Sequence, residues 1–224
     1  MREDAAFSHA RRLHSMTLQN RPFPRRGLYL ITPEEADSGR LIERIRAVLP
    51  FAALLQYRDK LADAPLRLER ARALKALCGE FDVPLIINDD VALTAAIAAA
   101  GVHLGEEDGA IADARARLGG EAIIGASCYD RIGLAHSAVA QGVDYVAFGA
   151  LFPSPTKPHA RRATAELFAQ AAALGVPRVA IGGITPDNVR SAVAAGADLA
   201  AVISGVFDAA DPISAARSCA AAFD

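Results

Sequence analysis

The sequence is poor in the residues that cross-link a chain or bind metals through sulfur. It contains three cysteines, an odd number, and none lies at the C-x-x-C spacing typical of metal sites. A disulfide framework and a zinc site are therefore not indicated. Reduced thiols are the simplest interpretation.

Long apolar runs and a surplus of positive charge are also missing. No apolar run reaches the roughly 18 residues that span a bilayer, and the chain begins with Arg2, Glu3 and Asp4 instead of a signal-peptide core. The formal net charge of -2 gives no basic footprint for nucleic acid or an anionic membrane. We therefore expect a cytoplasmic protein that binds neither, in which local groups hold any anionic ligand.

The 224 residues suffice for one eight-unit β/α barrel with a single large core. From Gly27 onward, short apolar runs alternate with longer Ala-, Leu- and Arg-rich stretches, a pattern typical of βα units around a parallel sheet. We count eight such pairs. The expected strands are residues 28–32, 53–57, 85–88, 102–104, 122–126, 145–149, 178–181 and 199–204.

These patterns predict an α/β protein, a (β/α)8 TIM barrel that forms a single domain over residues 27–224. A flavodoxin-like open sheet is the competing architecture, but it normally needs only about five strands. Residues 1–26 carry several arginines and prolines without strong periodicity, so we interpret them as an N-terminal extension outside the barrel. The expected helix caps are Ser38, Asp63, Asp130 and Thr185.

Polar residues at the carboxyl ends of the strands are informative, because the active sites of such barrels lie there. Gln56, Arg58 and Lys60 are spaced by two, so an extended backbone would aim all three to the same side. Such a cluster suits a diphosphate, because Arg grips phosphate oxygens bidentately and Lys adds a compact charge. The alternative is a solvated surface stripe. Tyr57 would face the opposite layer, and Asp59 is a candidate partner of Arg58 or Lys60.

Acidic residues follow the next two strands. Asn88 and Asp89 end the third, and Asp108 follows the fourth. Two hard oxygen donors that face a diphosphate would hold Mg²⁺, because this ion binds through a few carboxylates, substrate phosphates and water. One such acid alone is more often a helix cap than a ligand.

The last three strands end in further candidates. A proline-stiffened loop follows the sixth, and its alternative interpretation is a plain surface turn. Glycines and a serine end the seventh and eighth, where barrels often bind phosphate through backbone N–H groups, although a glycine pair also serves tight turns. These candidates are Ser154, Pro155, Thr156, Lys157, Gly183, Ile203 and Ser204.

Two polar side chains lie in the central strands or at their ends. His103 is inside an apolar run, where a satisfied core histidine is at least as good an interpretation as a catalytic one. Ser127 follows the fifth expected strand, so its hydroxyl is a candidate ligand contact. No His-Asp partnership at triad geometry can be deduced for Ser127 or Cys128.

Five ordered motifs resemble the thiamine-phosphate synthase (thiamine-phosphate pyrophosphorylase) family across nearly the whole chain after Gly27. They are residues 56–60, 87–89, 102–105, 154–157 and 180–184. The resemblance implies a transferase that joins 4-amino-2-methyl-5-(diphosphooxymethyl)pyrimidine to 4-methyl-5-(2-phosphoethyl)thiazole, or to its carboxylated precursor. It also implies Mg²⁺ as cofactor, release of diphosphate by a dissociative mechanism and small-molecule substrates as the partners. A homo-oligomer is left open.

The resemblance also assigns roles to residues, with Arg58, Lys60, Lys157 and Ser127 as the catalytic candidates. Tyr57, Asp59 and Pro155 complete the expected substrate site. The chain departs from the family pattern at Ser154, where threonine is usual, and at Cys128-Tyr129. The implied ligands are Gln56, Arg58, Lys60, Asn88, Ser127 and Lys157 for the pyrimidine diphosphate, Asp89 and Asp108 for Mg²⁺, and Ser154, Thr156, Gly183, Ile203 and Ser204 for the thiazole phosphate.

Two alternatives stay open. A thiazole tautomerase resembles this family in fold and phosphate site but needs no groups for diphosphate or Mg²⁺, so the presence of Arg58, Lys60, Asp89 and Asp108 disfavours it. A non-catalytic ligand-binding homologue would be marked by the loss of these charged residues. None of them is lost.

Overall fold

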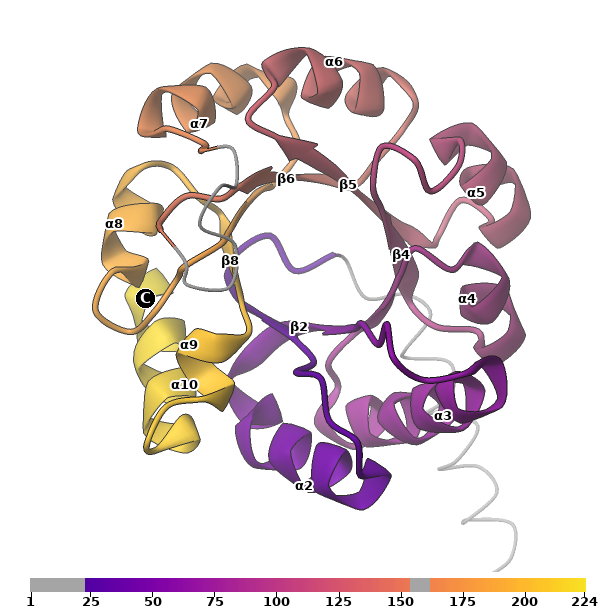
Figure 1. Ribbon diagram of the computed structural model, residues 1–224. Helices are drawn as coiled ribbons and strands as arrows, with labels where there is room; N and C mark the ends of the chain where they lie inside the picture. Colours follow the sequence, from indigo (N-terminus) through magenta and orange to yellow (C-terminus); the bar gives the residue numbers. More distant parts are fainter. Residues whose placement is uncertain (1–22, 154–161) are drawn as a thin grey trace, which may run out of the picture.

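The computed structural model describes residues 23–153 and 162–224. Within these residues, parallel strands pair in chain order from β1 to β8 and close into a barrel (Figure 1). Helices surround the strands on the outside (Figure 1). The predicted (β/α)8 barrel is therefore confirmed.

Each expected strand overlaps an observed one. The largest differences are in β5, which extends past Ser127 to Tyr129, and in β8, which ends at Val202. Ser204 therefore begins a helix and does not end a strand. The strands are β1 (Gly27–Ile31), β2 (Ala52–Tyr57), β3 (Leu85–Asn88), β4 (Gly101–Leu104), β5 (Ile123–Tyr129), β6 (Tyr145–Gly149), β7 (Arg178–Ile181) and β8 (Leu199–Val202).

The helices occupy the Ala-, Leu- and Arg-rich stretches, as their intrinsic propensity predicts. Short 3₁₀ turns follow three of them, at Leu49–Phe51, Ala172–Leu174 and Ala221–Phe223. No helix among the residues described is long and apolar enough to cross a membrane. The helices are α2 (Ser38–Val48), α3 (Ala64–Phe81), α4 (Val91–Ile97), α5 (Ile111–Leu118), α6 (Ile132–Ala140), α7 (Ala165–Ala171), α8 (Val189–Ala194), α9 (Ser204–Phe207) and α10 (Pro212–Ala220).

Only one of the four expected helix caps is an N-cap residue. Asp63 accepts a hydrogen bond from the backbone N–H of Leu66 at 3.0 Å and so caps α3. The other three expectations are wrong because the helices begin at other positions. The observed N-cap residues are Asp37 in place of Ser38 for α2, Arg131 in place of Asp130 for α6, and Asn188 in place of Thr185 for α8.

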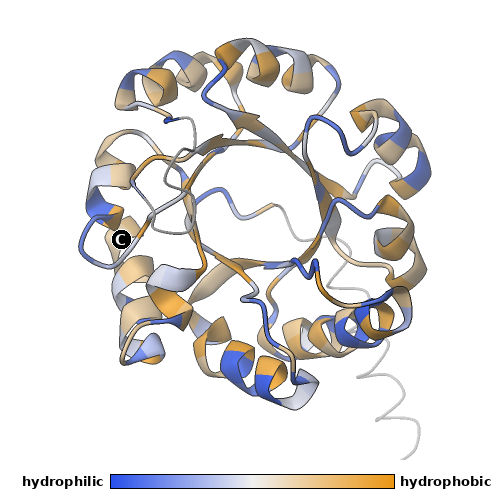
Figure 2. Cartoon of the chain, viewed as in Figure 1, coloured by the Kyte–Doolittle hydropathy of each residue, from blue (hydrophilic) through white to orange (hydrophobic). Residues whose placement is uncertain are grey.

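The apolar residues form two layers. The outer layer lies between strands and helices and includes Tyr57, as expected for a residue that faces away from Gln56. The inner layer fills the barrel. Figure 2 shows the strands mostly in the hydrophobic colours and several loops at the barrel mouth in the hydrophilic ones. The inner layer consists of Tyr29, Ile31, Leu54, Ile86, Ile123, Tyr145, Ala147, Val179, Leu199 and Ala201.

The residues that precede β1 contact the barrel. Phe23 packs against the inner layer, with its ring stacked on that of Tyr145 at a centroid distance of 5.3 Å. The Arg26 guanidinium donates to the carbonyl oxygen of Phe223 at 2.9 Å. These residues belong to the stretch interpreted above as an extension, and its remainder, residues 1–22, lies outside the described residues.

Candidate active site

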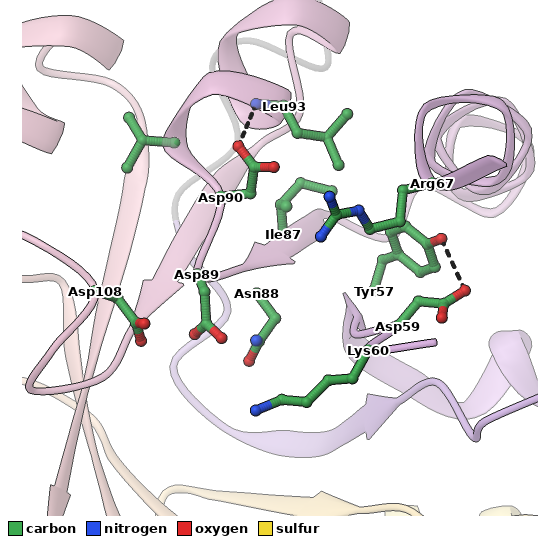
Figure 3. A pocket seen from close by; sticks show the side chains of 11 residues that line it. Tyr57, Asp59, Lys60, Arg67, Ile87, Asn88, Asp89, Asp90, Leu93 and Asp108 are labelled. Carbon is green, nitrogen blue, oxygen red and sulfur yellow. Dashed lines mark hydrogen bonds between the residues drawn. The ribbon is translucent and has the colours of Figure 1, made fainter. Parts of the chain in front are cut away.

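The carboxyl ends of β2 and β3 and the loop after β4 surround an open cavity of about 580 Å³ (Figure 3). Its lining brings together six residues singled out from the sequence, and it also includes Arg67, which sequence reasoning missed. The polar lining residues are Tyr57, Asp59, Lys60, Arg67, Asn88, Asp89, Asp90 and Asp108.

Asp89 and Asp108 form a carboxylate pair on one side of this cavity, and Lys60 extends into it from another (Figure 3). Asp89 has a left-handed backbone, with φ 62°, and Asp108 accepts a hydrogen bond from the N–H of Gly105 at 2.7 Å. Burial raises the pKa of Asp89, and the hydrogen bond and charge of Asp108 raise it further, to about 6, against the opposing charge of Lys60. A cation placed between the two carboxylates would relieve this repulsion.

The donor set at the pair fits Mg²⁺. In the described part of the chain, no group of three or more His, Cys, Asp or Glu residues gathers at one point. A cation beside Asp89 and Asp108 would therefore complete its shell with water and with ligand oxygens. Mg²⁺ binds in this way when substrate phosphates are present.

A buried arginine holds the loop between β2 and α3. The guanidinium of Arg70 donates to Asp59 at 2.8 Å and to two backbone carbonyls of the segment before α2. Burial raises the pKa of Asp59, but hydrogen bonds from the Ala62 N–H and from Arg70 outweigh this effect and lower it. The expected pairing of Asp59 with Arg58 or Lys60 is therefore wrong, because Arg70 of α3 occupies that carboxylate.

Gln56, Arg58 and Lys60 do not share one face, contrary to the prediction from their spacing. Strand β2 ends before Arg58, so the alternation of an extended strand does not continue to Lys60. Gln56 points into the barrel and Lys60 lines the cavity. Arg58 is absent from the lining, and its guanidinium approaches the carboxylate of Glu34 at 3.7 Å.

Arg67 adds a cation that sequence reasoning missed. It lies in the first turn of α3, and its side chain reaches past Tyr57 toward the cavity (Figure 3). A cation near a helix N-terminus is disfavoured by the helix dipole. A basic residue so soon after the Asp63 cap was the available signal that this position deserved attention.

The glycine pair at the end of β7 permits close backbone packing. Gly182 and Gly183 have left-handed backbones, with φ 97° and 66°, and a Cβ on Gly183 would lie 2.4 Å from the carbonyl oxygen of Pro153. Asn188 fixes the following turn, because its amide donates to the Gly183 carbonyl at 2.8 Å and accepts from the N–H of Thr185 at 2.9 Å. The pair thus places the segment after β6 against the end of β7.

The loop after β8 packs against the loop after β7. Ser204 is the first residue of α9, and a Cβ on Gly205 would lie 2.1 Å from the carbonyl oxygen of Ile184. Gly183, Ile203 and Ser204 therefore lie on neighbouring loops at one edge of the mouth. The other residues expected there, Ser154, Pro155, Thr156 and Lys157, lie outside the described residues.

Ser127 has a histidine partner that sequence reasoning did not find. Its hydroxyl and the Nε2 of His103 are 2.8 Å apart, and the Nδ1 of His103 is 2.9 Å from the hydroxyl of Tyr145. Burial lowers the pKa of His103 to about 4, with Asp108 opposing, so the ring is neutral near pH 7. His103 is 8% exposed, with a hydrogen-bond partner at each ring nitrogen. The missing signal was cross-strand register, which sets His103 beside Gly125 and so on the same face as Ser127.

A closed barrel whose mouth combines cations, paired carboxylates and a glycine-lined edge is typical of enzymes that act on phosphorylated small molecules. Residues 28–206 match the family model described as thiamine monophosphate synthase. The chain therefore belongs to the thiamine monophosphate synthase family, and the resemblance inferred from its motifs is confirmed.

Curated relatives support the same assignment. A thiamine-phosphate synthase of Xanthomonas campestris pv. campestris (strain 8004) is 57% identical over 207 residues, which cover 92% of this chain and 98% of the relative. A thiamine-phosphate synthase of Azoarcus sp. (strain BH72) is 58% identical over 200 residues, which cover 88% of this chain and 97% of the relative. The similarity thus extends over nearly the whole length of both relatives.

Two solved structures distinguish similarity within the family from similarity of the fold alone. A thiamine phosphate pyrophosphorylase from Pyrococcus furiosus matches with a TM-score of 0.78 at 33% identity, covering 89% of this chain and 96% of that one. A 3-hexulose-6-phosphate synthase matches with a TM-score of 0.66 at 16% identity, covering 88% and 99%. The second match shows the shared barrel alone.

Proposed function

We propose that this protein is a transferase of thiamine biosynthesis. It condenses 4-amino-2-methyl-5-(diphosphooxymethyl)pyrimidine with 4-methyl-5-(2-phosphoethyl)thiazole, or its carboxylated precursor, to thiamine phosphate and releases diphosphate. The observation that carries the proposal is the pair Asp89 and Asp108, which shares a cavity with Lys60 in a barrel of this family. A cytoplasmic location and the absence of nucleic-acid and membrane partners stay predictions.

The charged side of the mouth would take the pyrimidine diphosphate. Asp89 and Asp108 would hold Mg²⁺. When bound there, the ion would neutralise the negative charge that develops on the leaving diphosphate. Lys60 and Arg67 extend into the same cavity, and Asn88 adds an amide. Preorganised charges of this kind stabilise a transition state in which the carbon–oxygen bond breaks and diphosphate departs with the electron pair.

Arg58 and Asp59 contribute from the loop between β2 and α3. Arg58 lies at the mouth beside Glu34, from where its guanidinium would reach the outer phosphate oxygens. The carboxylate of Asp59 already accepts from Arg70 and from two backbone N–H groups. Its contribution is therefore to fix the loop that carries Arg58 and Lys60.

The opposite edge of the mouth would hold the thiazole phosphate. Gly183, Ile203 and Ser204 lie there on neighbouring loops, where barrels commonly bind phosphate through backbone N–H groups. The thiazole nitrogen would then attack the carbon from which diphosphate has departed, forming the new carbon–nitrogen bond. No protein nucleophile is needed, so catalysis rests on positioning and electrostatics.

The assay is thiamine phosphate formation from both heterocycles by purified protein, with Mg²⁺ and then with a chelator. We expect magnesium-dependent product, and a fall in kcat/KM of about 100- to 1,000-fold in Asp89→Asn and Asp108→Asn, the range seen when one preorganised electrostatic contact is lost. Glu107→Gln, which removes an exposed charge next to Asp108, is the matched control and should stay within about twofold.

No thiamine phosphate from folded protein with Mg²⁺ present would exclude this function. Product that forms equally well with chelator, or undiminished turnover in both carboxylate variants, would exclude the roles proposed for Mg²⁺, Asp89 and Asp108. Thiazole isomerisation without any condensation would instead favour the tautomerase alternative. Circular dichroism of each variant shows whether the barrel is intact.

A further inference from the structure

A continuous chain of hydrogen bonds crosses the barrel interior beneath the mouth. Gln56 Nε2 donates to the Tyr29 hydroxyl at 2.8 Å, and the hydroxyls of Tyr29 and Tyr145 are 2.8 Å apart. The Tyr145 hydroxyl is 2.9 Å from His103 Nδ1, and His103 Nε2 is 2.8 Å from Ser127 Oγ. We call these five residues the inner relay. It connects Gln56 and Ser127, two side chains that the family resemblance implies as ligands of the pyrimidine diphosphate.

The inner relay occupies space that apolar side chains fill in most barrels of this kind. Tyr145 is 0% exposed, Tyr29 1% and Gln56 3%, and burying such polar groups is costly unless each finds a hydrogen-bond partner. Strand β5 has a glycine, Gly125, where the Tyr145 ring packs. A Cβ at this position would lie 2.0 Å from the ring, so a larger residue would collide with it. Phe23 stacks on the same ring, with the two ring planes 6° from parallel. Several elements thus combine to seat one buried hydroxyl.

The Gln56 amide donates to Tyr29, which favours one direction for the inner relay. If the Tyr29 hydroxyl donates to Tyr145 and Tyr145 donates to Nδ1, the single proton of the neutral His103 would lie on Nε2 and be donated to Ser127. At one end, the Ser127 proton is left to donate to a ligand. At the other end, the Gln56 carbonyl oxygen is turned away from Tyr29 and is left to accept.

We propose that Tyr29, Tyr145 and His103 are positioning residues that set the hydrogen-bond polarity of the two ends of the inner relay. They present Ser127 as a donor and Gln56 as an acceptor. This polarity matches a ligand that carries phosphate oxygens at one end and an amino group on a heterocycle at the other. The inference rests on the proposed function, together with the ligand roles that the family resemblance implies for Gln56 and Ser127.

The main test separates the kinetic constants of the two substrates. Tyr145→Phe removes one oxygen and keeps the ring, and we expect it to lower kcat/KM for the pyrimidine diphosphate by about tenfold, the size of one buried hydrogen bond. The KM for the thiazole phosphate should stay within about twofold, because its site lies at the other edge of the mouth. Phe148→Leu, on the same strand but in the outer layer, is the control. It should lower the melting temperature without changing either kinetic constant.

Variants of His103 test whether the effect passes through Ser127. His103→Leu should reduce kcat/KM for the pyrimidine diphosphate as Tyr145→Phe does, whereas His103→Gln, whose amide nitrogen can replace Nε2 as donor, should recover most of it. In a Ser127→Ala background, His103→Leu should add no further loss. Tyr145→Phe keeps the test informative if His103→Leu does not fold.

Three outcomes would overturn the inference. In the first, Tyr145→Phe and His103→Leu lower only the melting temperature. In the second, the His103→Leu loss persists in full in the Ser127→Ala background. In the third, Ser127→Ala leaves kcat/KM unchanged, so that Ser127 has no contact with the substrate. Failure of the proposed function is distinct, because the wild-type protein would then form no thiamine phosphate.

Discussion

The two halves of the barrel mouth differ in the groups that they present, and we call them the charged half and the backbone half. The half formed by β2, β3 and β4 presents ionisable side chains, with Lys60 and Arg67 around the carboxylates Asp89 and Asp108. The half formed by the ends of β7 and β8 presents glycine backbone, where Gly183 lets the neighbouring loop pack closely. One half therefore holds its ligand by charge and the other by shape and backbone.

This difference follows the proposed chemistry. A diphosphate that departs gains negative charge in the transition state, so nearby charges accelerate the step. The phosphate of the thiazole does not react, and groups that bind it equally before and during the reaction increase affinity but not turnover. Ionisable residues are expected where charge changes, and backbone donors suffice where it does not.

The charged half should depend most strongly on buried ion pairs for its shape. Arg70→Met would leave Asp59, whose side chain is 8% exposed, without its cation. We expect the free energy of unfolding to fall by about 3–5 kcal/mol, because a buried charge is then uncompensated. Chemical denaturation measures the loss.

Arg46→Met is the matched control for Arg70→Met. Arg46 pairs with Glu80 on the surface, where both side chains are about half exposed, and such pairs contribute about 1 kcal/mol or less. If the free energy of unfolding fell equally in the two variants, the buried pair of Arg70 and Asp59 would stabilise the charged half no more than a surface pair does.

Adding a single methyl group at Gly183 should lower stability and weaken binding in the backbone half. Gly183→Ala combines a left-handed backbone with a contact of 2.4 Å, and we expect a loss of about 1–3 kcal/mol in stability. The KM for the thiazole phosphate should rise while the magnesium dependence stays unchanged. Thermal unfolding and steady-state kinetics measure the two effects.

Gly175→Ala isolates the backbone-strain part of this effect. Gly175 also has a left-handed backbone, with φ 74°, but a Cβ there meets nothing within 4 Å. Its cost should be about 1 kcal/mol, from backbone strain alone. If Gly183→Ala costs no more and leaves KM unchanged, close packing at the end of β7 is not what shapes this half.

The alternation of apolar runs with helix-forming stretches was enough to predict the barrel. Three predicted strands, residues 85–88, 145–149 and 178–181, agree with the observed bounds. The place of Asp89 and Asp108 near each other also followed, because neighbouring parallel strands bring their carboxyl ends together. These predictions depend only on period and order along the chain.

The missed features depend on where a strand stops and on register between strands. The expected common face of Gln56, Arg58 and Lys60 failed because β2 ends at Tyr57. The partner of Asp59 is a helix residue, Arg70, that no local spacing indicates. Hydrogen bonds across the barrel interior join residues 24 to 116 positions apart in the sequence. Local spacing in one sequence does not indicate such pairs.

The smallest predicted effect is a pH dependence confined to the charged half. Burial and then Asp108 raise the pKa of Asp89 from its ordinary value of 3.8 to about 6. The folded, metal-free protein therefore binds more protons than the unfolded chain between these values, so this group makes the free energy of unfolding fall as pH rises from about 4 to about 6.

Asp108→Asn tests this dependence, because it removes the like charge and leaves the burial effect. In chelator, its melting temperature should match the wild type near pH 4 and exceed it by a few degrees near pH 7.5. Added Mg²⁺ should close this gap by stabilising the wild type more than the variant. A gap that is the same at every pH would mean that the two carboxylates do not interact, and the backbone half and the charged half would then differ less than their composition implies.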